Sequence, residues 1–574
     1  MTSCRAKRRP AMARRMAAGL FAAALGTASA AQAQAPLSTY DPETMELAEP
    51  AHSGREVRVD VKELKAPSAE SVGALDQAHG GFAPTLWGGT SALVARKLIP
   101  QLPGAPASQV VRDLERRLLL TAAAAPDGAV EGDRPSLVEL RAERLAAIGD
   151  SDGVVQLAAA APQSVAGPVV GRAKLDALLL SGNTQAACAD APKDNSLPKL
   201  SVLCHFLAGR MLEGNLGLDL LRERKDADHG FAAAAEVLSG LPPLPADKIR
   251  LDELTPVHVA AFAAAKMPLP ADAVAKAPPA VARAVALSFA TPFDVRLAAG
   301  ERAEAAGTLP VEALRKLYLE AAFAPDELGS PLARAEGAGP RARALLFRAA
   351  TDQPDPLIRA HFIAKALDLA AAKGQTAAAA RVFAALLAEA RPDPALITVA
   401  PAFARANLAL GRADATRWLE LARTDPAASG AVARLWPLTA VLTVSPGQPA
   451  GTTGLAGWRA GLEGLPPEIA ARRMAVVLGS LSALGAKVPD AAWLDTLALP
   501  PGGPRPGLFA LLQGAALDAR LGTTLLASLA AIGDQPLDKL DPVTLSETIS
   551  ALTVVGLGDD ARKLAVEAML ANGI

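Results

Sequence analysis

The sequence predicts an all-α fold, an α-solenoid of antiparallel helical hairpins, and three observations point to this class. About 130 of the 574 residues are alanine, the residue with the highest helix propensity. Apolar residues recur at the helical period from Ser91 onward. Several of the intervals between glycines suited to ending helices are about 33–37 residues, the length of a two-helix repeat. An irregular helical bundle whose hairpins have ordinary lengths is the alternative.

The N-terminal segment has the pattern of a secretory signal peptide. Residues 1–16 contain six basic residues and no acidic one, and residues 17–30 are apolar and end in small side chains. An A-x-A motif then predicts cleavage between Ala33 and Gln34. We therefore expect residues 1–33 to be removed and the mature protein to be periplasmic or secreted. Two arginine pairs leave the choice between the general and the twin-arginine export route open.

Export makes the cysteine count informative. After removal of Cys4 with the signal peptide, only Cys188 and Cys204 remain. Two thiols in an oxidising compartment suggest a disulfide, and both residues fall on consecutive predicted helices that could face each other across a hairpin. Two reduced, buried thiols are the alternative.

Composition and patterning divide the mature chain into four further segments. Residues 56–62 alternate strictly between polar residues and valines, which is typical of a strand or of an extended arm lying on helices. The segment rich in Gly, Pro and Thr at 444–454 lacks periodicity and predicts a linker. The expected organisation is a disordered segment at 34–55, an N-terminal helical-repeat array at 56–443, a linker at 444–454 and C-terminal helical hairpins at 455–574.

Helix stripes and helix ends support the hairpin prediction. Ser136 and Glu139 match a capping box, which opens a helix that Gly149 would close. Residues 356–390 contain two apolar faces separated by a glycine, as in an antiparallel hairpin. Nine glycines are predicted to end helices: Gly149, Gly182, Gly214, Gly307, Gly374, Gly411, Gly485, Gly522 and Gly556.

One helix shows the expected separation of apolar and charged residues clearly. Val111, Leu114 and Leu118 form an apolar stripe at positions i, i+3 and i+7. The charged residues between them, including Arg112 and Glu115, are predicted to face away from the core.

Charge and motif searches exclude several function classes. The chain has 58 basic and 59 acidic residues and 3% aromatic residues, which argues against a nucleic-acid binder. No H-E-x-x-H, G-x-S-x-G or P-loop motif occurs, and the six histidines lack metal-ligand spacing. The stretch Gly556 to Ala561 matches a dinucleotide motif but joins two predicted helices, so a helical turn is favoured. We predict no catalytic residue, cofactor or metal, and no transmembrane anchor after signal cleavage.

The loop at residues 80–90 is the first choice for a special site. It is rich in glycine and carries Phe82 and Trp87 in a chain with few aromatic residues. An aromatic side chain on an exposed loop can anchor a partner. The alternative is that Trp87 packs on the first helices of the array.

Units such as Leu410-Gly411-Arg412-Ala413-Asp414-Ala415, together with the repeat period, resemble tetratricopeptide-type α-solenoids. More particularly, the chain is similar to uncharacterised Ala-rich exported proteins of Gram-negative bacteria. The consensus W-x-x-L-G-x-x-Y is absent, so the exact repeat family stays open. The resemblance implies a non-catalytic scaffold that binds a protein or peptide partner in the cell envelope. The alternative is an accessory or catalytic component of a peptidoglycan-processing enzyme system.

Overall fold

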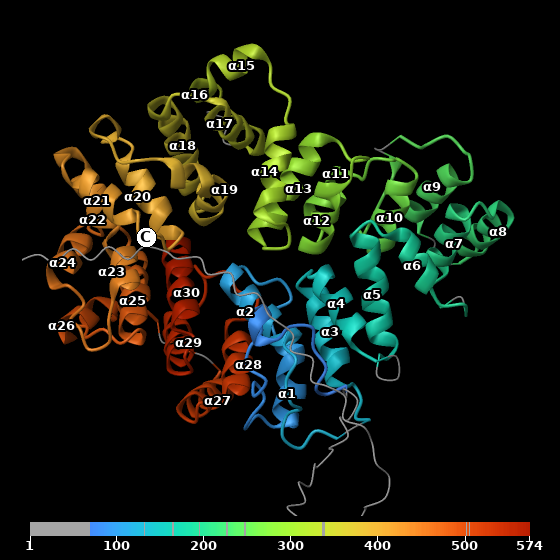
Figure 1. Ribbon diagram of the computed structural model, residues 1–574, viewed down its shortest axis with the longest axis horizontal. Helices are drawn as coiled ribbons and strands as arrows, with labels where there is room; N and C mark the ends of the chain where they lie inside the picture. The colour runs from blue at the N-terminus through green and yellow to red at the C-terminus, as the bar shows by residue number, and fades with distance from the viewer. Residues whose placement is uncertain are drawn as a thin grey trace, which may run out of the picture. The chain divides into compact units, whose positions relative to one another are not determined.

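The computed structural model describes residues 69–574 apart from 131, 163–165, 195, 225–227, 246–247, 336–338, 501 and 504. This part of the chain is all-α: it contains 30 α-helices, several short 3-10 turns and no β-strand (Figure 1). Consecutive helices pack against each other as antiparallel hairpins, in the manner of an α-solenoid. The predicted cleavage site at Ala33–Gln34, the segment 34–55 and the alternating segment 56–62 lie outside the described residues.

The first ten helices follow the loop that carries Trp87. Their bounds are α1 (Ala92–Leu98), α2 (Gln109–Leu120), α3 (Leu137–Ala147), α4 (Ser151–Ala160), α5 (Pro168–Leu180), α6 (Thr184–Asp190), α7 (Pro198–Leu207), α8 (Met211–Arg222), α9 (His229–Leu238) and α10 (Pro256–Ala264).

The middle helices include the hairpin predicted at residues 356–390, which is α18 followed by α19. The bounds are α11 (Ala271–Lys276), α12 (Pro279–Leu287), α13 (Phe293–Ala305), α14 (Val311–Glu320), α15 (Pro325–Gly329), α16 (Pro331–Arg334), α17 (Pro340–Asp352), α18 (Pro356–Ala371), α19 (Thr376–Glu389) and α20 (Ala400–Ala409).

The last ten helices include the longest one, α25, with 17 residues. Their bounds are α21 (Ala415–Arg423), α22 (Ser429–Arg434), α23 (Trp436–Thr443), α24 (Thr452–Ala460), α25 (Pro467–Ala483), α26 (Asp490–Trp493), α27 (Pro506–Leu517), α28 (Leu521–Ile532), α29 (Pro542–Val554) and α30 (Gly558–Ala571). None of the helices in the described part combines the length and the apolar character that a membrane span requires.

Most predicted helix ends are confirmed, with two corrections. The capping box of Ser136 and Glu139 opens α3, and Gly149 follows it with a φ of 72°. Gly214 instead lies inside α8, because the preceding helix already ends at Gly209, whose φ is 73°. Gly522 likewise lies at the start of α28, because Ala519 turns the chain there with a φ of 53°.

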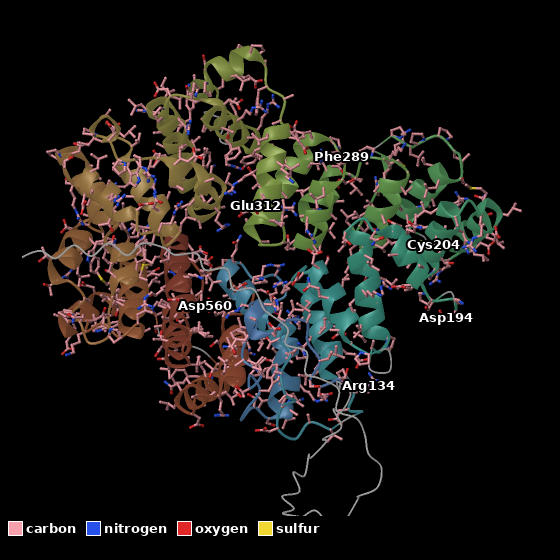
Figure 2. All side chains as sticks on the ribbon, in the orientation of Figure 1. Arg134, Asp194, Cys204, Phe289, Glu312 and Asp560 are labelled. Carbon is pink, nitrogen blue, oxygen red and sulfur yellow. A yellow bond between two sulfur atoms is a disulfide. The ribbon has the colours of Figure 1, made fainter. Side chains whose placement is uncertain are left out.

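The first described helices pack against the last ones, a contact that the sequence analysis did not anticipate. In Figure 1, α2 lies beside α28 and α30, and it contacts both of them. A guanidinium nitrogen of Arg117 on α2 lies 3.0 Å from a carboxylate oxygen of Asp560, which Figure 2 labels on α30. The backbone N–H of Thr523 donates to the hydroxyl of Thr90 over 3.1 Å. Residues more than 400 positions apart in sequence are therefore held together directly.

Two charged residues of α2 that were expected to face away from the core are buried. Val111, Leu114 and Leu118 are buried as predicted, but Arg112 and Glu115 are buried as well. Both oxygens of the Glu115 carboxyl lack a hydrogen bond within the described residues. Burial, opposed by Arg144 on α3 and by Arg112, raises the pKa of Glu115 to about 8. The prediction failed because α2 is covered on more sides than one hairpin partner can cover.

The segment 444–454 connects helices of one compact unit, which spans residues 65–574. The backbone N–H of Gly447 donates to the carbonyl of Gly485 over 2.8 Å, and that of Ala450 donates to the carbonyl of Lys487 over 3.1 Å. The sequence predicts a linker between two arrays here because the segment lacks periodicity. The structure instead fixes it by hydrogen bonds to the turn after α25.

Candidate functional site

The loop singled out by its aromatic residues is part of the packed interior. Phe82 is 5% exposed and Trp87 is 2% exposed. The Arg117 guanidinium lies 4.4 Å above the centre of the Phe82 ring. The backbone N–H of Gly522 donates to the carbonyl of Leu86, next to Trp87, over 3.0 Å. These side chains therefore do not form an exposed anchor for a partner, and their geometry agrees with the packing alternative.

Cys188 and Cys204 form a disulfide between α6 and α7. The Cα atoms of Cys188 and Cys204 lie 5.5 Å apart. Figure 2 labels Cys204 on α7, and the bond fixes this helix to the preceding one. Its position matters because the N-terminal end of α7 contributes to the cleft described next.

A cleft of about 570 Å³ lies among α7, α8, α9 and residues 244 and 248–250, and we call it the cationic cleft. Its floor is apolar, and its rim carries most of the charges. The floor consists of Leu218 and Leu221 on α8, Phe231, Ala232 and Ala233 on α9, and Leu244 and Ile249 from the following segment. A volume of this size is within the range of known ligand sites, roughly 300–1,000 Å³.

Positive charge dominates the rim of the cleft. Among the residues that the structure describes, five cationic side chains line it, namely Lys199, Arg222, Arg224, Lys248 and Arg250, against two acidic ones, Asp228 and Glu236.

Both acidic groups of the rim are already neutralised by neighbours. Glu236 forms an ion pair with Arg222. Asp228 forms an ion pair with Lys199. Lys248 and Arg250 are exposed and form no ion pair within the described residues. The cleft therefore presents unbalanced positive charge beside apolar surface.

Asp228 joins α9 to α10 through a buried histidine. One carboxylate oxygen caps α9 by accepting the backbone N–H of Phe231 over 3.0 Å. The other oxygen lies 2.8 Å from Nε2 of His258, whose Nδ1 accepts the backbone N–H of Thr255. Nε2 therefore carries the ring proton, and this N–H donates a hydrogen bond to the Asp228 carboxylate.

The carboxyl of Asp228 stays ionised in this setting. Burial raises its pKa, but hydrogen bonds from His258 and Lys199 more than offset burial and hold the pKa well below its usual range. Three donors occupy its oxygens, so Asp228 is a structural anion that orders the cleft rather than a free general base.

A second groove, of about 760 Å³, lies among α24, α25 and α26. It is lined mostly by alanine, leucine and proline side chains, and its charges largely cancel. Arg459 and Asp495 form an ion pair across 2.7 Å there. The cationic cleft is the stronger candidate because it combines apolar surface with charge that needs a counterpart.

Two short motifs, Gly556 to Ala561 and Asp150 to Gly153, have structural roles in the described residues. Gly556 to Ala561 spans the turn from α29 into α30, as predicted. Asp150 caps α4 by accepting the backbone N–H of Gly153 over 3.1 Å. No group of three or more His, Cys, Asp or Glu side chains in the described part is placed to hold a metal ion.

The residues of the cationic cleft carry little sequence signal. Arg222 and Arg224 flank Glu223, and Lys248 and Arg250 follow a proline-rich break, so no uninterrupted basic run marks the site. Comparison with protein-family models, with curated proteins and with solved structures gives no match.

Proposed function

We propose that the protein is an exported, non-catalytic α-solenoid scaffold that binds a protein or peptide partner in the cell envelope. The cationic cleft is the observation that carries this proposal. Its apolar floor can bury a hydrophobic side chain, and its rim can pair with a carboxylate. Export is proposed from the signal-peptide pattern of residues 1–33. The resemblance to tetratricopeptide-type solenoids supports a binding role.

The partner chemistry follows from the balance of charge in the cleft. Lys248 and Arg250 face an occupant with no acidic partner of their own among the described residues. An acidic residue beside a large apolar residue would satisfy both the rim and the floor. We therefore propose a partner segment that combines aspartate or glutamate with leucine-like side chains.

Site-specific crosslinking in living cells tests the proposal. A photoreactive residue replaces Leu244, which lines the cleft and is 46% exposed. The proposal predicts a discrete protein adduct in the envelope fraction that disappears in the charge-reversal variant K248E/R250E. The matched control K373E/R391E changes the net charge equally at exposed positions outside the cleft and retains the adduct. An adduct that persists in K248E/R250E, or no adduct at all, contradicts the proposal.

Export is tested separately by isolating the protein from the envelope fraction. The expected N-terminal residue of the mature chain is Gln34. A chain that still begins at Met1 in the cytoplasmic fraction contradicts the proposed location, whatever the cleft binds.

A further inference from the structure

Helix α8 exposes an apolar face on the side away from the cationic cleft. Leu212 is 85% exposed, Leu216 is 64% exposed and Leu220 is 54% exposed. Their spacing of four residues places them along one side of the helix, and we call these three residues the α8 leucine face. Leu218, on the opposite side of the same helix, is buried in the cleft floor. The two surfaces are therefore distinct.

Large apolar side chains in a continuous line are unusual on the surface of a soluble protein. Single exposed leucines are common, but an aligned set usually marks an interaction site. Helix α8 packs against α7 and α9 (Figure 1), and neither covers this face.

The charges beside the leucine face are acidic. Glu213, Asp219 and Glu223 are exposed, and the helical rotation of about 100° per residue places all three within about 60° of the leucine line. Asp219 pairs with Arg222 over 3.0 Å. Glu213 and Glu223 form no ion pair within the described residues. An occupant of this face therefore meets uncompensated negative charge on its flanks.

We propose that the α8 leucine face binds an amphipathic helix of a partner protein whose apolar stripe is flanked by lysine or arginine. Leucines at helical spacing pack against a second helix, and flanking charges select its identity, as in coiled coils. A symmetric pair with a second copy would place acidic flanks against acidic flanks. An anionic membrane surface would be repelled by the same carboxylates. Charge complementarity thus favours a basic helix.

Two synthetic peptides test the proposal by fluorescence anisotropy. Both carry leucines at helical spacing, one flanked by lysines and the other by glutamates. The titrations use the full chain with K248E/R250E, because this change reverses the two unpaired cations of the rim and separates the test from the proposed function of the cleft. The lysine-flanked peptide is expected to bind at least about tenfold more tightly than the glutamate-flanked one.

Charge reversal on α8 should invert this preference. Adding E213K/E223K is expected to weaken the lysine-flanked peptide by about tenfold and to strengthen the glutamate-flanked one. The control E143K/E420K makes the same net change at exposed positions on α3 and α21 and keeps the original preference. All four positions are exposed, so the fold should be retained, and circular dichroism checks this. An inverted preference cannot arise from loss of structure.

Three results would overturn the proposal. The first is that the K248E/R250E protein binds both peptides equally or binds neither of them. The second is a dimer of the unmodified chain in sedimentation velocity that L216D dissociates, because the occupant would then be a second copy. The third is binding to phosphatidylglycerol vesicles that L212S/L216S abolishes, because the face would then be a membrane surface.

Discussion

Replacing Gly522 with alanine should weaken the contact between the Trp87 loop and α28. A Cβ at this position would lie 2.7 Å from the carbonyl oxygen of Leu86, 2.8 Å from the Trp87 ring and 2.9 Å from the Thr90 hydroxyl. The Leu86 carbonyl cannot move away freely, because it accepts the N–H of Gly522 itself. The added methyl group therefore meets backbone and packed side chains rather than a flexible chain end.

The size of the effect follows from two opposing contributions. Overpacking a well-filled interior costs about 1–3 kcal/mol. Alanine in place of glycine returns up to about 1 kcal/mol of helix propensity, and less at a helix start such as that of α28. We expect G522A to lower the free energy of unfolding by roughly 1–2 kcal/mol. A matched control is Gly171 in α5, where an added Cβ meets nothing within 4 Å.

Guanidinium unfolding distinguishes the two variants by the sign of the change in the free energy of unfolding. G171A should raise the free energy of unfolding by about 0.5–1 kcal/mol, whereas G522A should lower it. Hydrogen exchange should also show faster exchange in peptides covering residues 86–92 and 519–526 of G522A, because the contact between them is weakened. Refutation would be a G522A protein as stable as the unmodified chain, with unchanged exchange in both segments.

Three further predictions concern the disulfide and two buried charges. C204S should lower stability by about 3 kcal/mol, and a reductant should destabilise only the parent chain; equal stability without reductant would contradict this. The pKa of Glu115 is raised from 4.5 to about 8 in the folded protein. The free energy of unfolding that depends on neutral Glu115 is therefore fully present below pH 4.5 and is lost as the pH rises through 8. E115Q should remove this loss in pH-dependent denaturation, and an unchanged pH slope would refute the assignment. R141K should lower the free energy of unfolding by about 2–3 kcal/mol in denaturant titrations. The buried Arg141 donates to three backbone carbonyls, and a single lysine ammonium cannot reach all three. A loss below about 0.5 kcal/mol would contradict this role of Arg141.

Local patterns predicted local structure well. Ser136 and Glu139 specified the start of α3 because both partners of a capping box lie within one helical turn. The hairpin at 356–390 was visible because its two apolar faces and the intervening glycine are contiguous. Such signals depend only on neighbours in sequence. All-α class and hairpin organisation therefore followed from the sequence.

Contacts between distant segments were not predictable in this way. No sequence pattern around Thr523 or Thr90 indicates that these two residues are in contact. Gly522 was interpreted as a helix end. The structure shows instead that the Trp87 loop passes so close to this position that a side chain would clash. Glu115 sits at a polar helical position and is buried only because α2 is covered on several sides. A single sequence contains no information on which helices meet when their pairing is not sequential.

The cationic cleft was missed for a related reason. Lys199 and Arg250 come from separate elements, and their common location depends on how α7 and the segment after α9 pack. Trp87 was conspicuous in the sequence because aromatic residues are rare, but rarity does not distinguish a buried anchor from an exposed one.

Calorimetric titration with a synthetic peptide of alternating glutamate and leucine tests the central proposal, binding in the cationic cleft, most directly. The unmodified chain is expected to bind this peptide, and K248E/R250E is expected to weaken binding by about tenfold or more. K373E/R391E should leave the affinity unchanged, and added salt should weaken binding to the unmodified chain. Equal affinity of the unmodified chain and K248E/R250E, or no binding by either, would contradict binding in the cationic cleft.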